Sequence, residues 1–316
     1  MAMITNSLII PVYKNELNIP SLIEAIRNMH KELLNDLEVV FVVDGSPDKS
    51  YEILKNSLEK EDFSSKLVLL SRNFGSFPAI RTGLQVATGK YFAVMAADLQ
   101  EPPELAIEFF RTLKNEPIDV AIGTRDGRDD PFLSQLASNL FWNFYKKFVV
   151  TDMPTGGIDV FGCNKAFRDS LLKLDESHSS LIAQIFWLGF RRKQVYYKRL
   201  ERQLGVSAWT LKKKVTYMMD SIFSFTDLPI KLLTRIGGLG IVIFGILGFI
   251  TFISKLMGFI SVPGYTAMFL AVGFFGAINL FGLGIIGSYA WRTYENTKAR
   301  PLSVILSVEE FDESKK

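Results

Sequence analysis

The sequence is poor in the residues that form disulfides or bind transition metals. It contains one cysteine, Cys163, and two histidines among 316 residues. A single cysteine excludes an internal disulfide and any metal site built from several cysteines. Because Cys163 follows Phe161 and Gly162, we expect it to be a small buried apolar side chain. His30 and His178 lie among polar residues, so we expect both to be solvated and no histidine-rich zinc site to form.

The N-terminus lacks the features of a secretory signal. Residues 1–13 carry no basic leader, and Pro11 interrupts their short apolar run. The net charge of +3 is too small to indicate nucleic-acid binding. We therefore expect the soluble part of the chain to remain in the cytoplasm and to bind no nucleic acid.

The first two thirds of the chain alternate between short apolar runs and amphipathic segments. The expected strands are 8–12, 37–43, 66–70, 91–96 and 119–122, and the expected helices are one capped by Ser21, then 50–58, 77–87 and 104–114. Strands that alternate with helices predict a parallel sheet with right-handed crossovers. Ligands bind at the carboxyl ends of the strands in such sheets, and Asp44 and Asp98 lie at two of those ends.

Two long stretches without charge, 236–254 and 264–291, follow the alternating region. Each is long enough to cross ~30 Å of hydrocarbon as a helix, so we predict two transmembrane spans. Lys231 and Arg235 precede the first span and Arg292 follows the second, which places the catalytic domain and both termini in the cytoplasm. The many glycines of the spans permit close helix packing and a homo-oligomer.

A segment with an apolar stripe joins the two regions. It begins near Trp209 with three basic residues, Lys212, Lys213 and Lys214, and predicts a helix that lies on anionic lipid. An ordinary amphipathic helix packed on the catalytic domain is the alternative.

These patterns divide the chain into four parts. We expect a catalytic domain at 1–208, a juxtamembrane segment at 209–231, two membrane helices within 232–294 and a cytoplasmic tail at 295–316. The end of the tail, 308–316, is charged, and we expect it to be mobile.

A cluster of oxygen ligands follows the strand predicted at 91–96. The sequence Asp98-Leu-Gln-Glu101 offers two carboxylates and an amide oxygen within one turn. Mg²⁺ and Mn²⁺ prefer such ligands, and either ion stabilises a pyrophosphate leaving group when a sugar leaves a nucleotide.

Several motifs, in order along the chain, resemble those of one enzyme family. They are IPVYKNELNI (10–19), VVDGSPD (42–48), LSRNFGSFPAIRTGL (70–84), VMAADLQEPPEL (94–105), TGGIDVF (155–161) and RQLGVSAW (202–209). In this order they resemble the inverting, GT-A-fold glycosyltransferases of family two, and among them the polyprenyl-phosphate glycosyltransferases.

The resemblance implies a GT-A catalytic domain, Rossmann-like with a mostly parallel sheet, followed by an interfacial helix and two transmembrane helices. It implies transfer of a sugar from a nucleotide sugar to undecaprenyl or dolichyl phosphate at the cytoplasmic membrane. The product would be a lipid-linked sugar for cell-envelope glycan or glycoconjugate modification, and its anomeric configuration would be inverted.

The resemblance also implies roles for particular residues. Asp44 would read a nucleobase N–H, and Asp98 and Gln100 would hold Mg²⁺ or Mn²⁺ and the donor pyrophosphate. The other residues that it assigns to the donor site are Pro11, Tyr13, Glu16, Arg72 and Asn73. Asp159 would lie near the acceptor, as a base or as an orienting group, and Arg202 and Ser207 would belong to a loop that closes on the phosphates.

Three positions depart from the family pattern. Val43 and Ala96 stand where aspartates are common, and Ala208 stands where a lysine is common. The missing carboxylate at Ala96 has three alternative explanations: a weaker metal site, a different donor, or an enzyme that has lost its activity. A non-catalytic membrane protein that binds nucleotide sugars is therefore the rival from another class.

Two further enzyme classes fit less well. A processive polysaccharide synthase usually carries Gln-x-x-Arg-Trp, whereas this chain has Gln184-Ile-Phe-Trp187. A dinucleotide-dependent dehydrogenase needs a Gly-x-Gly-x-x-Gly turn after its first strand, which this chain lacks.

Overall fold

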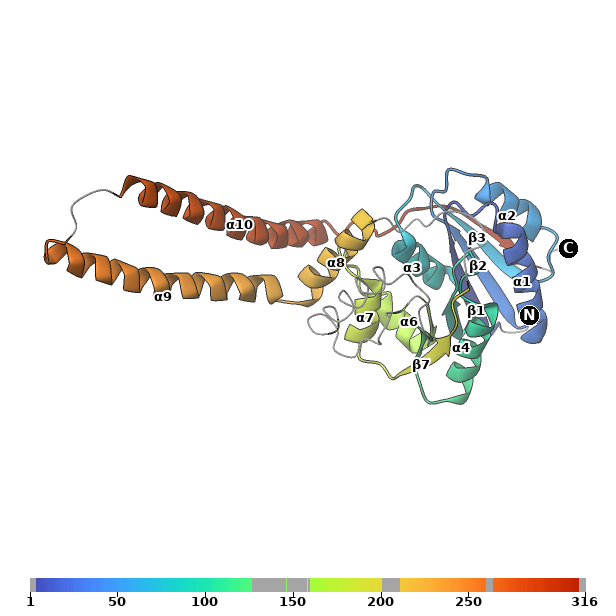
Figure 1. The fold of residues 1–316 in the computed structure, drawn as a ribbon. Helices are drawn as coiled ribbons and strands as arrows, with labels where there is room; N and C mark the ends of the chain where they lie inside the picture. The colour runs from blue at the N-terminus through green and yellow to red at the C-terminus, as the bar shows by residue number, and fades with distance from the viewer. Residues whose placement is uncertain are drawn as a thin grey trace.

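The computed structural model describes residues 4–126, 146, 158, 160–200, 211–259 and 264–312. The sheet lies in one domain, and two long helices project from it (Figure 1). The strands are β1 (Asn6–Val12), β2 (Leu37–Val43), β3 (Ser64–Leu70), β4 (Tyr91–Val94), β5 (Val120–Arg125), β6 (Phe161–Asn164), β7 (Arg192–Tyr197) and β8 (Ile305–Phe311). The helices are α1 (Ile19–Glu32), α2 (Ser50–Leu58), α3 (Ser76–Val86), α4 (Pro103–Asn115), α6 (Lys165–Leu171), α7 (Leu181–Trp187), α8 (Leu211–Phe225), α9 (Leu228–Leu256) and α10 (Tyr265–Thr297).

The strands form one sheet in the order β7-β5-β6-β4-β1-β2-β3-β8. β1 pairs in parallel with β2 and β4, β2 with β3, and β5 with β7. Only β6 and β8 run antiparallel to their neighbours among the described strands. The predicted α/β class with a mostly parallel sheet is therefore confirmed.

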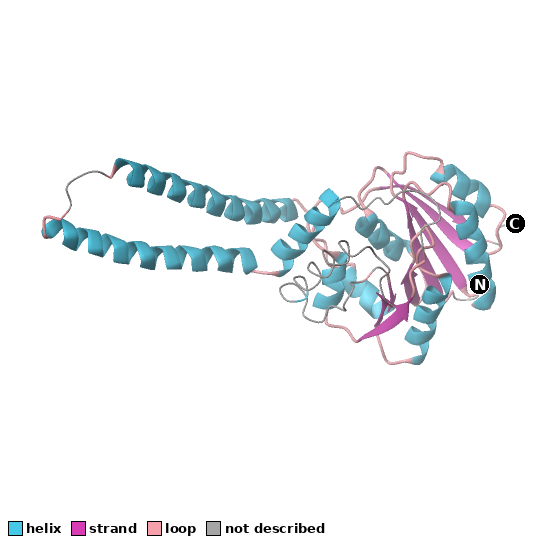
Figure 2. Ribbon diagram, viewed as in Figure 1, coloured by secondary structure: helices cyan, strands magenta, loops and turns pink. Residues whose placement is uncertain are grey.

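Helices cover both faces of the sheet, as Figure 2 shows. The core on one face of the sheet includes α1, α2 and α4, that on the other face includes α3, α6 and α7, and β2 is buried along its whole length between them. A strand covered on both sides needs apolar residues at every position, which explains the continuous run from Leu37 to Val43.

Two expectations for the first helix and its surroundings are wrong. The helix begins at Ile19, so Asn18 rather than Ser21 precedes its first turn, and Pro20 occupies that turn, where no amide donor is needed. His30 is buried, with 5% of its surface exposed, and its ring lies 6.0 Å from that of Phe63. Met29 and His30 lie on the face of α1 that packs on the core, whereas Lys31 and Glu32 in the same turn are exposed, so the polar neighbours of His30 in the sequence do not predict its burial.

The expectation of a mobile C-terminal end is also wrong for residues up to Phe311. The chain returns from α10 and adds β8 antiparallel to the edge strand β3, from Ser65 opposite Phe311 to Leu70 opposite Ile305. Glu309 accepts hydrogen bonds from the Tyr51 hydroxyl at 2.5 Å and from Lys55 Nζ at 2.9 Å. The charges of this segment thus pair with α2.

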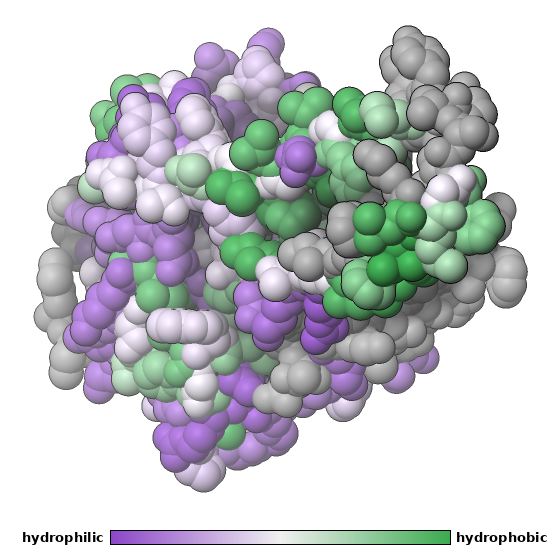
Figure 3. Space-filling model, turned by 90° about the vertical axis from the view of Figure 1, so that its left-hand side faces the viewer, coloured by the Kyte–Doolittle hydropathy of each residue, from purple (hydrophilic) through white to green (hydrophobic). Residues whose placement is uncertain are grey.

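The two long helices carry many exposed apolar side chains. Figure 3 views the molecule from the end where these helices project, and hydrophobic side chains gather there. Within the described residues, one segment is long and apolar enough to cross a membrane, Phe274–Thr297 in α10, and its most apolar window is 0% buried.

Short contacts hold α8 against α10 and the catalytic domain. Arg292 of α10 donates to Asp220 of α8 at 2.8 Å, and the guanidinium of Arg292 lies 5.1 Å from the centre of the Phe223 ring. The hydroxyl of Ser224 donates to the carbonyl oxygen of His178 at 2.5 Å. α8 therefore joins the catalytic domain to the long helices.

Candidate active site

The carboxyl ends of the parallel strands meet at one edge of the sheet. β1 lies between β4 and β2, so the residues that follow these three strands, including Tyr13, Asp44 and Asp98, lie at the same edge. Arg72 and Asn73 follow β3 at this edge. Pro11 lies within β1, opposite Val42, and is half-buried. The sheet thus brings together the predicted donor-site residues that the structure describes.

Asp44 fixes the loop that carries Arg72 and Asn73. Its carboxylate is 2% exposed and accepts the backbone N–H of Phe74 at 2.7 Å and that of Gly75 at 2.8 Å. In this structure, Asp44 therefore acts on the backbone of the neighbouring loop. Its contact with a nucleobase stays a prediction.

Gly45 allows the loops after β2 and β3 to touch. Its φ is +56°, and a Cβ atom at this position would lie 2.3 Å from the carbonyl carbon of Arg72. Any side chain here would therefore push the two loops apart.

The loop after β1 is tied to the loop after β2 through Glu16. Glu16 Oε2 accepts the backbone N–H of Lys49 at 3.0 Å, and the backbone N–H of Glu16 donates to Asp48 at 3.2 Å. Burial raises the pKa of Asp48, but hydrogen bonds from Ser46 and Ser50 outweigh it and hold that pKa below its usual value. Glu16 and Asp48 therefore shape the rim of the site.

The segment 98–101, for which the sequence predicts metal binding, forms a tight turn after β4. Leu99 has a positive φ of 53°, and Asp98 Oδ1 accepts the backbone N–H of Gln100 at 3.3 Å. Ala96 is half-buried just upstream, where the family pattern has a carboxylate. Asp98 and Gln100 are separated by one residue in this turn, and both lie at the edge of the sheet.

Arg199, which no sequence motif singled out, lies beside Gln100. Its Nη2 donates to Gln100 Oε1 at 2.6 Å, and the backbone N–H of Leu200 donates to the carbonyl oxygen of Gln100 at 2.9 Å. The segment that follows β7 thus reaches the turn that contains Gln100. The available sequence signal was weak: an arginine three positions before Arg202 in a basic segment.

Of the two carboxylates in this turn, Asp98 is half-buried, whereas Glu101 is buried with 4% of its surface exposed, so Asp98 is the one accessible to a metal ion. The described part of the chain contains no group of three or more histidine, cysteine, aspartate or glutamate side chains arranged to hold a metal. One carboxylate suits Mg²⁺, which takes few protein ligands and completes its shell with water and substrate phosphates. Asp98 therefore fits a metal shared with a donor pyrophosphate.

Three predicted site residues, Asp159, Arg202 and Ser207, lie outside the described residues. Cys163 lies in β6 and is fully buried, as predicted, and burial raises the pKa of its thiol. This thiol is therefore protonated at neutral pH and takes no part in the site.

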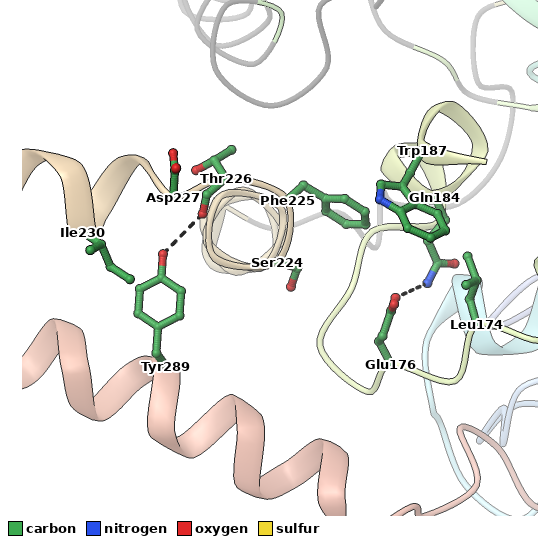
Figure 4. Close-up of a pocket in the computed structure, with 10 residues that line it drawn as sticks. All are labelled: Leu174, Glu176, Gln184, Trp187, Ser224, Phe225, Thr226, Asp227, Ile230 and Tyr289. Atoms are coloured by element: carbon green, nitrogen blue, oxygen red, sulfur yellow. Dashed lines mark hydrogen bonds between the residues drawn. The ribbon is translucent and has the colours of Figure 1, made fainter. Parts of the chain in front are cut away.

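Away from this edge, a hollow lies where the catalytic domain meets the long helices (Figure 4). It has a volume of about 700 Å³ and is lined by Trp187, Phe225 and Ile230 together with polar groups. Gln184 donates to Glu176 at 2.8 Å across one wall, and the Tyr289 hydroxyl donates to the carbonyl oxygen of Thr226 at 3.3 Å across the other. The hollow is thus lined by both apolar and polar groups, and hydrogen bonds join neighbouring residues of its walls.

Comparison with known proteins extends over almost the whole chain. A Bacillus subtilis protein named as a glycosyltransferase, CsbB, is 35% identical over 93% of this chain and 89% of its own length. The bactoprenol glucosyl transferase of Shigella phage SfX is 28% identical over 95% of this chain and 98% of its own length. An undecaprenyl-phosphate 4-deoxy-4-formamido-L-arabinose transferase of Photorhabdus laumondii is 28% identical over 96% of this chain and 93% of its own length.

Among solved structures, a glucosyl-3-phosphoglycerate synthase from Mycobacterium tuberculosis aligns with a TM-score of 0.48 at 16% identity. The alignment covers 74% of this chain and 80% of that chain. Residues 7–174 match the glycosyl transferase family 2. The match spans more than half of the chain and includes the edge that carries Asp44 and Asp98, so this protein is a glycosyltransferase that belongs to glycosyl transferase family 2.

Proposed function

We propose that this protein transfers a sugar from a nucleotide donor to a polyprenyl phosphate at the cytoplasmic face of a membrane. The observation that carries the proposal is a combination of two features. The turn of Asp98 and Gln100 lies at the carboxyl edge of the sheet, and two long apolar helices follow the sheet-containing domain in the same chain. The relatives whose names include bactoprenol and undecaprenyl phosphate align with this chain over nearly their full length, which supports this acceptor class.

The reaction is a single displacement at the anomeric carbon. A phosphate oxygen of the acceptor forms the new bond, the bond between the sugar and the donor phosphate breaks, and the nucleoside diphosphate leaves with that electron pair. The acceptor is already anionic near neutral pH, so no strong general base is required. One inversion converts an α-linked donor into a β-linked product.

The loops after β2, β3 and β4 perform separate tasks in this reaction. The loop braced by Asp44 presents Arg72 and Asn73 to the donor. Asp98 and Gln100 face the leaving pyrophosphate. Outside the described residues, Asp159 would orient the acceptor, and Arg202 and Ser207 would contact the phosphates. Binding and charge neutralisation therefore account for most of the chemistry asked of the protein.

Mg²⁺ or Mn²⁺ is part of the proposal. When bound, the divalent ion would neutralise the charge that develops on the leaving pyrophosphate. Asp98 would hold it, with donor phosphates as further ligands.

The long helices would tether the site to the acceptor. α9 and α10 are the proposed transmembrane spans, and α8 is the proposed interfacial helix. The lysines 212–214 belong to the first turns of α8 and would face anionic lipid. The hollow beside Trp187 and Phe225 lies at the junction that an acceptor leaving the bilayer would pass. This arrangement supports a multi-pass enzyme with its catalytic domain in the cytoplasm.

A donor panel tests the proposal. Purified full-length protein in vesicles with undecaprenyl phosphate would be incubated with labelled UDP-, GDP- and dTDP-sugars, and lipid-linked product would be separated and its anomeric configuration determined by NMR. We expect one donor to give a β-linked sugar phosphate lipid. Protein with Asp98→Asn is the matched control. Failure of every donor to yield product, while the protein still binds nucleotide, would favour the non-catalytic alternative.

A further inference from the structure

The contact between Arg199 and Gln100 joins two parts of the chain that are far apart in sequence. Arg199 Nη2 lies 2.6 Å from Gln100 Oε1, a short charge-assisted hydrogen bond. The next residue repeats the connection through the backbone, because the N–H of Leu200 donates to the carbonyl oxygen of Gln100 at 2.9 Å. Two bonds therefore hold the segment after β7 against the turn that contains Asp98 and Gln100.

This contact competes with one predicted role of Gln100. A glutamine side chain has one amide oxygen, and this oxygen already accepts a hydrogen bond from a permanently charged guanidinium. A divalent cation on the same oxygen would lie roughly 4–5 Å from Arg199, given usual metal–oxygen distances of about 2 Å. The two positive charges would repel each other. Gln100 therefore does not serve a metal and Arg199 equally well at the same time.

The site also has less negative charge than the family pattern provides. Ala96 supplies no carboxylate, which leaves Asp98 and the buried Glu101 as the acidic residues of the turn. Fewer carboxylates weaken the attraction for a divalent cation, whereas an arginine beside the turn attracts the donor phosphates directly. Both features weaken the binding of a metal ion and favour the binding of the donor phosphates by arginine.

We infer that Arg199 is a phosphate-binding residue of the donor site and takes over part of the charge neutralisation otherwise left to the metal. This inference rests on the proposed function. In the structure described here, Arg199 is held by Gln100. When a nucleoside diphosphate binds, the exposed guanidinium turns to the pyrophosphate oxygens. A guanidinium has five N–H donors, so those that do not contact the phosphates can still donate to Gln100.

The inference makes two predictions of opposite sign for Arg199→Gln. Without metal, the variant should bind UDP and GDP more weakly than the wild type, by roughly ten- to a hundredfold, which corresponds to one hydrogen bond to a charged group. Without nucleotide, the same variant should bind Mn²⁺ more tightly, because a positive charge beside Gln100 has been removed. A residue that merely supports the fold would weaken both.

The experiment uses the full-length protein in detergent. Calorimetric titration with UDP and with GDP in EDTA measures nucleotide binding, and electron paramagnetic resonance of free Mn²⁺ measures metal binding without turnover. Lys198→Gln is the matched control, since it removes the same charge from the exposed neighbouring position. Arg199→Lys keeps the charge but loses the planar fork and should lie between the wild type and Arg199→Gln. Thermal unfolding of each variant checks the fold.

The outcomes separate this inference from the proposed function. Equal nucleotide affinity of Arg199→Gln, Lys198→Gln and the wild type in EDTA would overturn it, as would weaker Mn²⁺ binding by Arg199→Gln. If the wild type binds neither UDP nor GDP and transfers no sugar from the donor panel, the proposed function itself fails. A wild type that transfers sugar while Arg199→Gln behaves like Lys198→Gln would refute only the role of Arg199.

Discussion

The carbonyl oxygen of Val304 accepts the backbone N–H of Ser71 at 2.9 Å, directly before Arg72 and Asn73 of the candidate donor site. One residue earlier, the hydroxyl of Ser303 lies 2.6 Å from that of Thr82 in α3. The segment that follows the second long helix thus braces the loop and the helix on both sides of the Arg72 position. The C-terminal segment is part of the catalytic domain.

Removing residues 301–316 should therefore destabilise the catalytic domain. The deletion exposes the edge of β3 and removes the partners of Ser71 and Thr82. We expect a lower thermal unfolding midpoint, greater aggregation and weaker nucleotide binding. Deleting only 312–316 is the control, because it leaves β8 intact. A soluble piece that ends near Arg202 would lack β8 as well, so an independently stable, nucleotide-binding fragment would contradict this account.

Asp98→Asn should lower the rate of sugar transfer roughly 100-fold or more, because an amide neither attracts a divalent cation nor neutralises its charge as a carboxylate does. EDTA should inhibit the wild type in the same way, and added Mg²⁺ or Mn²⁺ should restore it. Glu104→Gln, an exposed carboxylate in the first turn of α4, is the control and should keep its activity. Full activity of Asp98→Asn would remove the metal from the proposed mechanism.

Ala96→Asp should lower the metal concentration needed for half-maximal rate. The substitution restores a carboxylate two residues before Asp98, at a half-buried position at the end of β4. A second carboxylate would strengthen metal binding. The measurement is initial rate against Mn²⁺ concentration for both proteins. An unchanged or higher requirement would indicate that the site has compensated for Ala96 in another way.

Glu38→Gln should destabilise the domain by about 3–5 kcal/mol, the usual result of breaking a buried ion pair. The Glu38 side chain is 1% exposed, lies 3.0 Å from Lys66 Nζ and accepts hydrogen bonds from Ser7 and Thr88. Chemical denaturation measures the change. Glu310→Gln, an exposed carboxylate 4.0 Å from the same lysine, should change stability little.

The same buried pair predicts a pH dependence of stability. Burial raises the pKa of Glu38, but hydrogen bonds from Ser7 and Thr88 and the charge of Lys66 outweigh it, so the folded-state pKa is below the usual 4.5. A depressed carboxyl pKa contributes stability that is complete above the unfolded value. We expect this contribution to disappear as the pH falls below about 4.5 toward the folded-state pKa. The Glu38→Gln protein should lose less stability over that window.

Replacing the lysines at 212–214 with glutamine should lower the transfer rate on anionic vesicles and leave the rate in neutral detergent nearly unchanged. Each lysine near an anionic surface contributes about 1 kcal/mol at low salt. Initial rates against vesicle charge measure the effect. Equal losses in detergent and in vesicles would mean that these lysines serve the fold or the site, and the interfacial role of α8 would be abandoned.

The sequence predicted the elements with strong local patterns. The run from Leu37 to Val43 and the helix from Ser50 to Leu58 match β2 and α2 at both ends, because burial on two faces and a single amphipathic face leave clear periodicities. The order of motifs predicted the family and the carboxyl edge at Asp44 and Asp98. Local residue patterns and strand ends were sufficient for these features.

Contacts between distant segments were decided only by the tertiary structure. The apolar residues at 304–308 favour a strand but do not show that it pairs with β3, and the charges at 308–316 suggested a free tail. In the structure, α2 and β3 supply partners for this segment. The polar neighbours of His30 did not reveal that its face of α1 is buried. Likewise, the contact of Arg199 with Gln100 spans 99 residues of sequence. Amino-acid order determines local periodicity and motif chemistry, whereas these pairings depend on which surfaces the folded sheet brings together.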